Sequence, residues 1–406
     1  MISRPSSSGP GSPGEGSAWG GAELRFREDL GGWPGVLGRL SARQDLSAGE
    51  AACVLEEVLS GTATPAQIAA MLIALRMKGE TVEEMTGFVR AMLEHAERLD
   101  LGDLATGSGN SGNSGNSGNS GGSGNSGNSG GSGGHGPMID TCGTGGDRSG
   151  SINVSTISAL VVAGAGVPVC KHGGRAASSS AGSADVLEAL GVVVDLAPAG
   201  VATCIAEAGI GFCFAPRFHP AMRHAAPVRR DLGVPTVFNF LGPLANPARV
   251  PRQLIGVSDP AMAPKMLGVL RANGSERAMV VYGEDGLDEI STTGPTNVEE
   301  LTAEGELRTY VFDVAELGIA RARPDDLRGG DVSFNAEVVR RVLGGEAGPY
   351  RDIVVANSAA SLLVAGAAGD MAEGLERSNE ALDSGAAARA LELLVEASQG
   401  SREAGN

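Results

Sequence analysis

Aromatic and basic residues are scarce in this 406-residue chain. Phe, Trp and Tyr make up 3% of it, although hydrophobic residues make up 42%. The core must therefore be built from Ala, Val, Leu and Ile in closely packed helices and strands, which is typical of an α/β protein. Lys and Arg number 31 against 48 Asp and Glu, for a formal net charge of -17. Because nucleic acids and anionic membranes require a basic surface, neither is expected as a partner, and a phosphate ligand would need a local site.

Cysteines and long apolar runs are also few. The five cysteines are scattered, odd in number and contain no C-x-x-C pair, so neither a zinc motif nor a redox motif is indicated. Reduced thiols in a cytoplasm fit this usage best. No uninterrupted apolar run is long enough to span a bilayer, and the first 21 residues lack the apolar segment of a signal peptide. The sequence therefore predicts a soluble, cytoplasmic protein.

Composition divides the first third of the chain into three segments. Residues 1–35 are poor in apolar side chains and are predicted to be disordered, despite two tryptophans. Residues 36–106 show apolar residues at helical spacing, which predicts a small helical domain. We expect a helix around 220–232 to join this domain. Residues 107–136 repeat Gly, Asn and Ser, which is the composition of a flexible linker inserted into the chain.

The rest of the chain is predicted to form an α/β domain. From residue 138 onward, short apolar runs alternate with helix-like segments, which predicts βα units and a central, largely parallel or mixed sheet flanked by helices. Residues 137–398 are assigned to this domain and 399–406 to a flexible tail. The strand candidates lie at 167–169, 192–196, 212–214, 253–257 and 278–282.

One polar segment with a possible ligand role is Asp140-Thr-Cys-Gly-Thr-Gly-Gly-Asp147, which follows a strand candidate. Asn153-Val-Ser-Thr156 then begins a helix. Glycines let backbone amides approach a phosphate, and the N-terminus of a helix adds partial positive charge. Helix capping alone explains the same spacing equally well. The segment is neither a Walker A motif nor a G-x-G-x-x-G dinucleotide fingerprint.

Two further segments place ionisable groups after strand candidates. Lys171-His-Gly-Gly-Arg-Ala-Ala-Ser-Ser179 supplies the cations and hydroxyl donors that a diphosphate and a ribose could use. A solvated loop is the alternative, but the buried strand expected before it favours a ligand site. In Gly283-Glu-Asp-Gly-Leu-Asp-Glu-Ile290, the adjacent Asp288 and Glu289 offer the oxygen ligands that magnesium prefers. Since acidic turns are common on solvated surfaces, this segment alone does not establish a metal site.

In this order the segments resemble the anthranilate phosphoribosyltransferase family. The order is G-T-G-G-D, N-V-S-T, K-H-G-x-R-A-A-S-S, Arg229 ahead of F-N-F-L-G-P-L-A-N-P, and L-D-E. The resemblance runs from about residue 36 to 398, omits the Gly/Asn/Ser insertion, and extends to Asn357-Ser-Ala-Ala and Asp383-Ser-Gly-Ala-Ala. Each motif alone is degenerate or shared with other families. Five in the same order are specific.

The resemblance implies transfer of a phosphoribosyl group from phosphoribosyl pyrophosphate to the amine of anthranilate, in tryptophan biosynthesis. It also implies a magnesium cofactor and a homodimer formed through the helical domain. The residues that it places around phosphoribosyl pyrophosphate are Gly143, Gly146, Asp147, Ser151, Asn153, Val154, Ser155, Thr156, Lys171, His172, Gly173, Gly174, Arg175, Ala176, Ala177, Ser178, Ser179 and Ser183. The implied magnesium ligands are Ser155, Asp288 and Glu289. The implied anthranilate site consists of Gly143, Gly174 and Arg229, whose guanidinium would hold the carboxylate.

One position departs from the family pattern. The family loop reads K-H-G-N-R, and the Asn that contacts the acceptor is Gly174 here. Weaker anthranilate binding and a different aromatic amine as acceptor both remain open. His172 either lines the acceptor site or only orders its loop.

Two other functions also remain as alternatives. A pyrimidine nucleoside phosphorylase shares this architecture, although its loops lack the K-H-G-x-R-A-A-S-S sequence with a later D-E pair. A non-catalytic ligand-binding homologue is the second alternative, and Lys171 with the carboxylate pair argues against it. The main interpretation makes one geometric demand: Asp147, Lys171 and Glu289 must line a single cavity.

Overall fold

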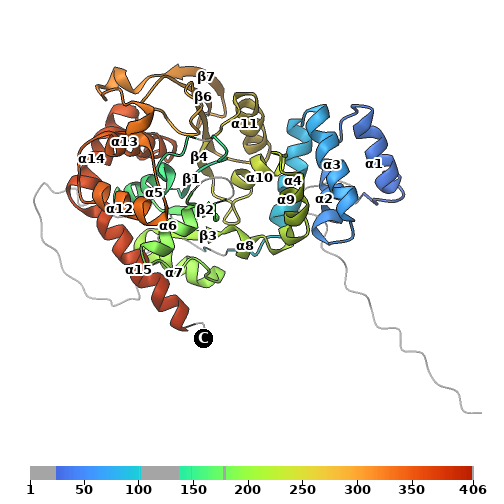
Figure 1. The fold of residues 1–406 in the computed structure, drawn as a ribbon, viewed down its shortest axis with the longest axis horizontal. Coiled ribbons are helices and arrows are strands. Elements are labelled where there is room, and N and C mark those ends of the chain that lie inside the picture. Colours follow the sequence, from blue (N-terminus) through green and yellow to red (C-terminus); the bar gives the residue numbers. More distant parts are fainter. Residues whose placement is uncertain (1–23, 100, 102–136, 148, 177–179, 405–406) are drawn as a thin grey trace, which may run out of the picture.

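The computed structural model describes residues 24–99, 101, 137–147, 149–176 and 180–404 (Figure 1). A small helical domain lies beside a larger α/β domain whose seven-stranded mixed sheet is flanked by helices. The predicted fold class is therefore confirmed. The Gly/Asn/Ser repeat at 107–136 lies outside the described residues.

The helical domain begins with four helices. They are α1 (Gly32–Ser41), α2 (Ala48–Leu59), α3 (Pro65–Lys78) and α4 (Val82–Glu94). Three of them, α2 to α4, start with a capping box, in which a Ser or Thr hydroxyl accepts a backbone N–H and a Glu or Gln three residues later accepts the N–H of the cap. These local signals explain why the sequence pattern located the three helices.

A second, distant segment completes this domain. The 220–232 region forms a 3-10 turn (Pro220–His224) followed by α9 (Ala226–Leu232), and these pack against α2 and α3. Next comes α10 (Phe238–Leu244), which contacts α4 on one side and α11 (Ala263–Ala272) on the other. The apolar core of the helical domain is therefore continuous with one face of the sheet.

The sheet has the strand order β3-β2-β1-β4-β5-β6-β7, in which the first five strands are parallel and the last two antiparallel. The strands are β1 (Ile139–Gly143), β2 (Val169–Gly173), β3 (Ile210–Phe214), β4 (Arg252–Gly256), β5 (Arg277–Gly283), β6 (Thr296–Leu301) and β7 (Leu307–Phe312). Alternate side chains of β5 enter different cores: Met279 and Val281 pack on one face, whereas Ala278 and Val280 pack on the other.

The larger core lies on the face of the sheet away from α10 and α11. The remaining helices are α5 (Val154–Gly164), α6 (Ser183–Ala189), α7 (Pro198–Ala208), α8 (Ala215–Phe218), α12 (Val332–Leu343), α13 (Pro349–Val364), α14 (Met371–Asp383) and α15 (Ala386–Ala404). Of these, α5 packs against α13, α14 and α15 and forms the centre of this core. In the described part of the chain, no helix is both long and apolar enough to cross a membrane.

The predicted disorder of 1–35 is wrong for its last part. Phe26 and Trp33 are buried in the core of the helical domain, with their ring centroids 5.4 Å apart in an edge-to-face arrangement. Two aromatic side chains bury enough apolar surface to order a short segment that is otherwise polar. Residues 1–23 lie outside the described residues.

Two predictions at the other end of the chain are also wrong. Residues 399–404 are not a flexible tail, because they continue α15, and Gln399 donates a hydrogen bond to the carbonyl of Gly191. Residues 192–196 are extended but form no strand. The backbone N–H of Val193 donates to the hydroxyl of Ser398 on α15, so a helix rather than a neighbouring strand satisfies it.

Candidate active site

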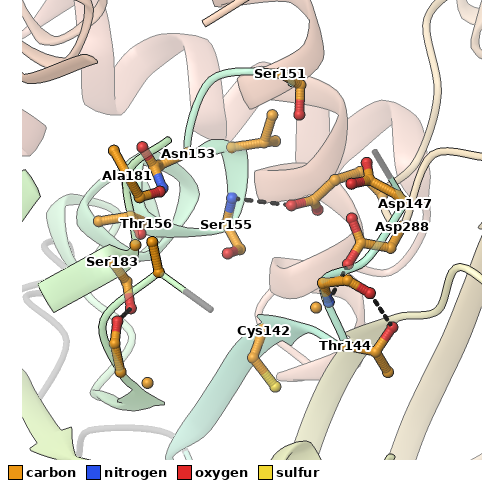
Figure 2. A pocket seen from close by; sticks show the side chains of 18 of the residues that line it. Cys142, Thr144, Asp147, Ser151, Asn153, Ser155, Thr156, Ala181, Ser183 and Asp288 are labelled. Carbon is orange, nitrogen blue, oxygen red and sulfur yellow. Dashed lines mark hydrogen bonds between the residues drawn. The ribbon is translucent and has the colours of Figure 1, made fainter. Parts of the chain in front are cut away.

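Three loops leave the sheet at the carboxyl ends of β1, β2 and β5 and enclose a cavity of about 520 Å³. This edge of a parallel sheet is where α/β proteins bind ligands. The cavity is lined by residues 142–147, 149–156, 171–176 and 180–183, together with Asn239, Asp288 and Glu289. Figure 2 shows Asp147 and Asp288 beside each other, across the cavity from Asn153 and Ser183.

The main interpretation of the sequence required Asp147, Lys171 and Glu289 to line one cavity, and all three line this one. Ala177, Ser178 and Ser179 lie outside the described residues. Every other residue predicted to surround phosphoribosyl pyrophosphate belongs to the lining. The structure therefore brings the predicted residues together, and their individual ligand roles stay predictions.

An acidic side of the cavity is formed by Asp147, Asp288 and Glu289. One oxygen of Asp288 accepts the N–H of Gly145 at 2.7 Å, and Glu289 accepts the N–H of Ser155 at 3.2 Å (Figure 2). Burial, and then the charge of Asp147, raises the pKa of Asp288 to about 7. Burial and the charge of Asp288 raise the pKa of Glu289 well above its usual value. The Oδ2 atom of Asp147 is buried and has no hydrogen-bond partner among the described residues.

Two glycines let the acidic loop approach the sheet. A Cβ atom at Gly256, the last residue of β4, would collide with the backbone of Asp288. A Cβ atom at Gly143, the last residue of β1, would collide with the Asp288 carboxylate. The loop therefore sits directly on the ends of two strands, where any larger residue would displace it.

A basic side is formed by the loop that follows β2. Lys171 is buried, and its Nζ donates to the carbonyl of Thr141 at 2.6 Å and to the hydroxyl of Ser155 at 3.3 Å. Its charge lowers the pKa of Glu289, against the larger effect of burial. Both hydrogen-bond acceptors of Lys171 are neutral, so its charge remains available to an anionic ligand.

Arg175 makes its ion pairs away from the lysine. It is exposed at the mouth of the loop and donates to Asp185 at 2.9 Å and to Glu188 at 2.6 Å. Its guanidinium also lies 5.5 Å from the centroid of the Phe214 ring. The predicted phosphate-binding arginine thus lines the cavity while being held by two carboxylates of α6.

A buried network lies beneath the basic loop. Asp140 accepts the N–H of His172 at 3.2 Å and the side-chain amide of Asn246 at 2.8 Å. Burial raises the pKa of Asp140 to about 6, although Lys171 opposes the shift. Asn246 also donates to the carbonyl of Cys170, so a single amide connects β1, β2 and the segment after α10. This network fixes the strand ends from which the loops depart.

His172 lines the cavity and its ring contacts α10, and its role in an acceptor site stays a prediction. Its Nδ1 lies 3.2 Å from the carbonyl of Gly242, which can only accept, so this nitrogen carries the proton. Its Nε2 is buried without a partner. Burial, and then His219 with its ring centroid 5.2 Å away, lowers the pKa of His172 to about 3. The imidazole is therefore neutral.

The structure does not bring Arg229 into the lining of the cavity. It lies half-buried on α9, with its guanidinium 5.3 Å from the centroid of the Phe238 ring, and the next residue, Asn239, does line the cavity. No ion pair links Arg229 to a carboxylate within the described ranges. Burial lowers the pKa of this guanidinium. Arg229 is therefore a cation one side chain away from the cavity, without an acidic partner.

Gly174 has room for a side chain. Among the described residues, the atom nearest to a Cβ built there is the Cβ of Ala215, at 4.0 Å. The backbone of Gly174 also lies outside the left-handed region that requires glycine. Neither space nor backbone geometry therefore explains the absence of the family's Asn at this position.

Sequence reasoning missed several lining residues. They are Cys142, Thr144, Gly145, Ser149, Gly150, Ile152, Ser180, Ala181, Gly182 and Asn239. All but the last lie between or beside predicted positions, so continuity of the loops could have identified them. Asn239 enters from α10, and the F-N-F-L-G-P-L-A-N-P motif was its only sequence signal.

The acidic side fits magnesium. Within the ranges that the structure describes, no group of three or more His, Cys, Asp or Glu side chains could hold a metal ion by itself. Magnesium typically binds one or two carboxylates and completes its coordination with phosphate oxygens and water. Burial raises the pKa of both Asp288 and Glu289, with a further rise from the charge of Asp147 on Asp288 and from that of Asp288 on Glu289, so a bound cation would stabilise both carboxylates in their charged form.

Comparison with known proteins shows the family of the chain. Residues 135–388 match the α/β domain of a glycosyl transferase family, and residues 34–96 match the helical bundle domain of such a family. An anthranilate phosphoribosyltransferase from Salinispora arenicola is 49% identical over 369 residues, which cover 90% of this chain and 96% of the relative. The chain belongs to the anthranilate phosphoribosyltransferase family. The resemblance seen in the sequence is confirmed.

Other members of the anthranilate phosphoribosyltransferase family agree with this assignment. The relative from a Nocardioides species is 50% identical and covers 90% of this chain and 98% of its own. The crystal structure of the Thermus thermophilus enzyme has a TM-score of 0.77 at 38% identity, covering 90% of this chain and 99% of that one. The Saccharomyces cerevisiae enzyme in complex with PRPP and Mg has a TM-score of 0.77 at 25% identity, covering 91% and 98%.

Proposed function

We propose that this chain transfers the phosphoribosyl group of phosphoribosyl pyrophosphate to the amine of anthranilate. The products are N-(5-phosphoribosyl)anthranilate and pyrophosphate, in tryptophan biosynthesis. The observation that carries this proposal is that Asp147, Lys171 and Glu289 line one cavity in a chain of this family. The enzyme class is that of a pentosyltransferase, which agrees with the glycosyl transferase family matches.

Binding of the donor is assigned to the loops after β1 and β2. Positive charge develops on the ribose and negative charge on the leaving pyrophosphate, so groups aimed at the pyrophosphate lower the barrier. We assign stabilisation of that charge to Lys171 and to the backbone of residues 143–147, in which the N–H of Gly145 is bound by Asp288 before a ligand enters. The N-terminus of α5 lines the same cavity and adds partial positive charge.

We assign magnesium to Ser155, Asp288 and Glu289. Mg is present with PRPP in the yeast structure. When bound, the ion would neutralise charge on the pyrophosphate. In this chain the backbone N–H of Ser155 already contacts Glu289, and its hydroxyl contacts Lys171. Ser155 thus lies between the acidic and basic sides, where a metal-bound diphosphate would have to lie.

Binding of the acceptor is assigned to Gly143, Gly174 and Arg229. The anthranilate amine is neutral and nucleophilic at pH 7, so a strong general base is unnecessary and positioning dominates. His172, being neutral, can line this site without repelling the positive charge that develops on the ribose. Arg229 would hold the carboxylate, which requires the α9 segment to approach the donor site when both substrates bind. Substrate-induced closure of this kind is common.

The decisive experiment follows the fluorescence of anthranilate with purified protein, phosphoribosyl pyrophosphate and magnesium. Fluorescence should fall only when all four components are present, and chelation of magnesium should stop it. Ring-substituted aromatic amines in place of anthranilate test the alternative acceptor that Gly174 leaves open. A separate arm with thymidine, uridine and phosphate, without magnesium, tests nucleoside phosphorolysis. Absence of turnover in every arm, with ligand binding retained, would indicate a non-catalytic homologue.

We further propose a cytoplasmic homodimer. All five cysteines are free thiols, as a reducing compartment favours. On the helical domain, Met77 is 70% exposed beside a hollow formed by α1 and α3. An exposed methionine on a largely apolar surface is the kind of feature that a subunit interface would cover. The molecular mass in solution tests this proposal directly.

A further inference from the structure

Asn357, on α13, holds the residue that follows the acidic pair. Its Oδ1 accepts the backbone N–H of Ile290 at 2.8 Å, and its Nδ2 donates to the backbone carbonyl of Ile290 at 2.9 Å. The amide also donates to the carbonyl of Ile353 one turn earlier, at 2.9 Å. The side chains of Asn357 and Ile290 are fully buried. One side chain therefore satisfies both backbone groups of a residue directly after Glu289.

This contact matters because it holds the acidic loop at Ile290, between the hydrogen bond of Leu287 with Gly283 and that of Ser291 with Thr296. Residues 287–290 belong to neither a helix nor a strand. On the upstream side, the Asp288 carboxylate accepts the N–H of Gly145. On the downstream side, the Asn357 amide bonds to the backbone N–H and carbonyl of Ile290, as a neighbouring strand would. The amide accepts one bond and donates two, so Leu loses all three, and Asp loses at least one because a carboxyl group donates once when protonated and not at all when ionised.

The helix that carries Asn357 also contacts the other half of the proposed metal site. Ser158 on α5 donates to the carbonyl of Val354 on α13, at 3.3 Å. The same helix α5 begins beside Ser155, whose N–H reaches Glu289. Thus α13 sets the position of the acidic loop and of α5 at once.

We propose that Asn357 is a positioning residue that fixes Asp288 and Glu289 in the geometry that binds magnesium. The proposal rests on the magnesium role assigned above. It gives Asn357 a task in metal binding beyond that of a satisfied polar group in a core. A purely structural Asn357 would affect the amount of folded enzyme, whereas a positioning residue affects the magnesium affinity of the enzyme that is folded.

The first test uses the metal-free protein and hydrogen–deuterium exchange of the peptide that contains Ile290. In the wild type, the Ile290 amide should exchange as slowly as the interior of α13. Asn357→Leu removes the acceptor of the Ile290 N–H, whereas Asn357→Asp keeps this acceptor and loses at least one of the two donor bonds. Exchange should quicken by about tenfold in Asn357→Leu and by less in Asn357→Asp. Ser358→Ala is the matched control, because Ser358 is equally buried on the same helix and its hydroxyl has no partner.

The second test measures the magnesium concentration that gives half-maximal turnover. We expect it to rise about tenfold in both Asn357 variants and to stay unchanged in Ser358→Ala. Excess magnesium should restore much of the lost rate. If Asn357→Leu fails to fold, the isosteric Asn357→Asp and the exchange of the wild-type amide still decide the matter.

The outcomes separate this inference from the proposed function. A wild type that turns over without magnesium removes the metal assignment, and this proposal with it. A magnesium-dependent wild type whose Asn357 variants keep the same half-saturating concentration overturns the positioning role alone. Rapid exchange of Ile290 in the wild type also overturns that role, whatever the kinetics show.

Discussion

The acidic and basic sides of the cavity keep their charges in different ways. On the acidic side, Asp288 and Glu289 are buried, and their contacts with Gly145 and Ser155 are backbone N–H groups. On the basic side, Lys171 donates to neutral oxygens only. No ion pair joins Lys171 to either acid in the part of the chain that the structure describes.

This difference teaches how a site can hold opposite charges without neutralising them. Uncompensated buried charges are costly, and here the cost appears as raised pKa values of the acids. A metal-bound diphosphate would supply a cation to one side and an anion to the other. In the basic loop, Arg175 forms ion pairs with Asp185 and Glu188 of α6, and these pairs involve neither Lys171 nor the acidic pair. The predictions below test each part of it.

Removing the acidic pair should have the largest effect. Replacing Asp288 and Glu289 together with Ala should lower turnover by about three orders of magnitude, because the metal contribution to the transition state is lost. The melting temperature at pH 7 should not fall, since two buried acids are removed. The matched control is Glu284→Ala, an exposed acid of the same loop. Turnover within tenfold of the wild type would remove the metal assignment.

The neutral His172 predicts a stability effect below pH 6.5. Its pKa is about 3 in the fold, against an ordinary value of 6.5, so its contribution is present above pH 6.5 and is lost as pH falls toward 3. When the pH falls from 6.5 to 4.5, the unfolding free energy of the wild type should fall by about 2 to 3 kcal/mol more than that of His172→Gln. Denaturant titrations at several pH values measure this difference. Parallel curves for the two proteins would show that His172 is charged in the fold.

Removing Arg229 tests the residue to which the acceptor carboxylate is assigned. Arg229→Ala should raise the Michaelis constant for anthranilate about 10- to 100-fold, as expected for loss of a charge-assisted bond to a carboxylate, and change that for the donor little. Arg230→Ala, its exposed neighbour on α9, is the control. A fall in kcat alone would contradict the carboxylate role.

Gly174 should give the smallest effect. Gly174→Asn restores the family residue in open space, so we expect the Michaelis constant for anthranilate to fall about three- to tenfold, the range of one hydrogen bond. Gly174→Ala fills space without supplying an amide and should leave the constant unchanged. If both variants behave alike, the missing amide does not set acceptor affinity, and a different aromatic amine becomes the better candidate.

Local signals made most of the fold and the donor site predictable. The three loops follow apolar strand candidates, and their glycines, hydroxyls and charges lie close together in the sequence. The capping boxes of α2 to α4 are equally local. These signals located the loops, and the order of the motifs, which resembles that of the family, then assigned Asp147, Lys171 and Glu289 to one site before the fold was known.

Long-range contacts account for what the sequence did not predict. Asn357 reaches Ile290 across 67 residues, and Asn246 reaches Asp140 across 106. Nothing near these residues in the chain indicates their partners. The wrong strand at 192–196 has the same origin, because its short apolar run is real but the distant Ser398 accepts the N–H of Val193. The order at Phe26 and Trp33 likewise depends on a core formed elsewhere.

The helical domain consists of two segments that lie far apart in the sequence, and this affects how the chain folds while it is being synthesised. Its core needs α9 and α10, which are made more than 120 residues after α4. A nascent chain that has emerged only through α4 therefore carries unfilled apolar surfaces on α2 and α3, because three strands must be synthesised before α9 and α10 follow. Stalled or truncated chains of this length should bind chaperones, and the first four helices expressed alone should aggregate or dimerise rather than fold as a stable monomer.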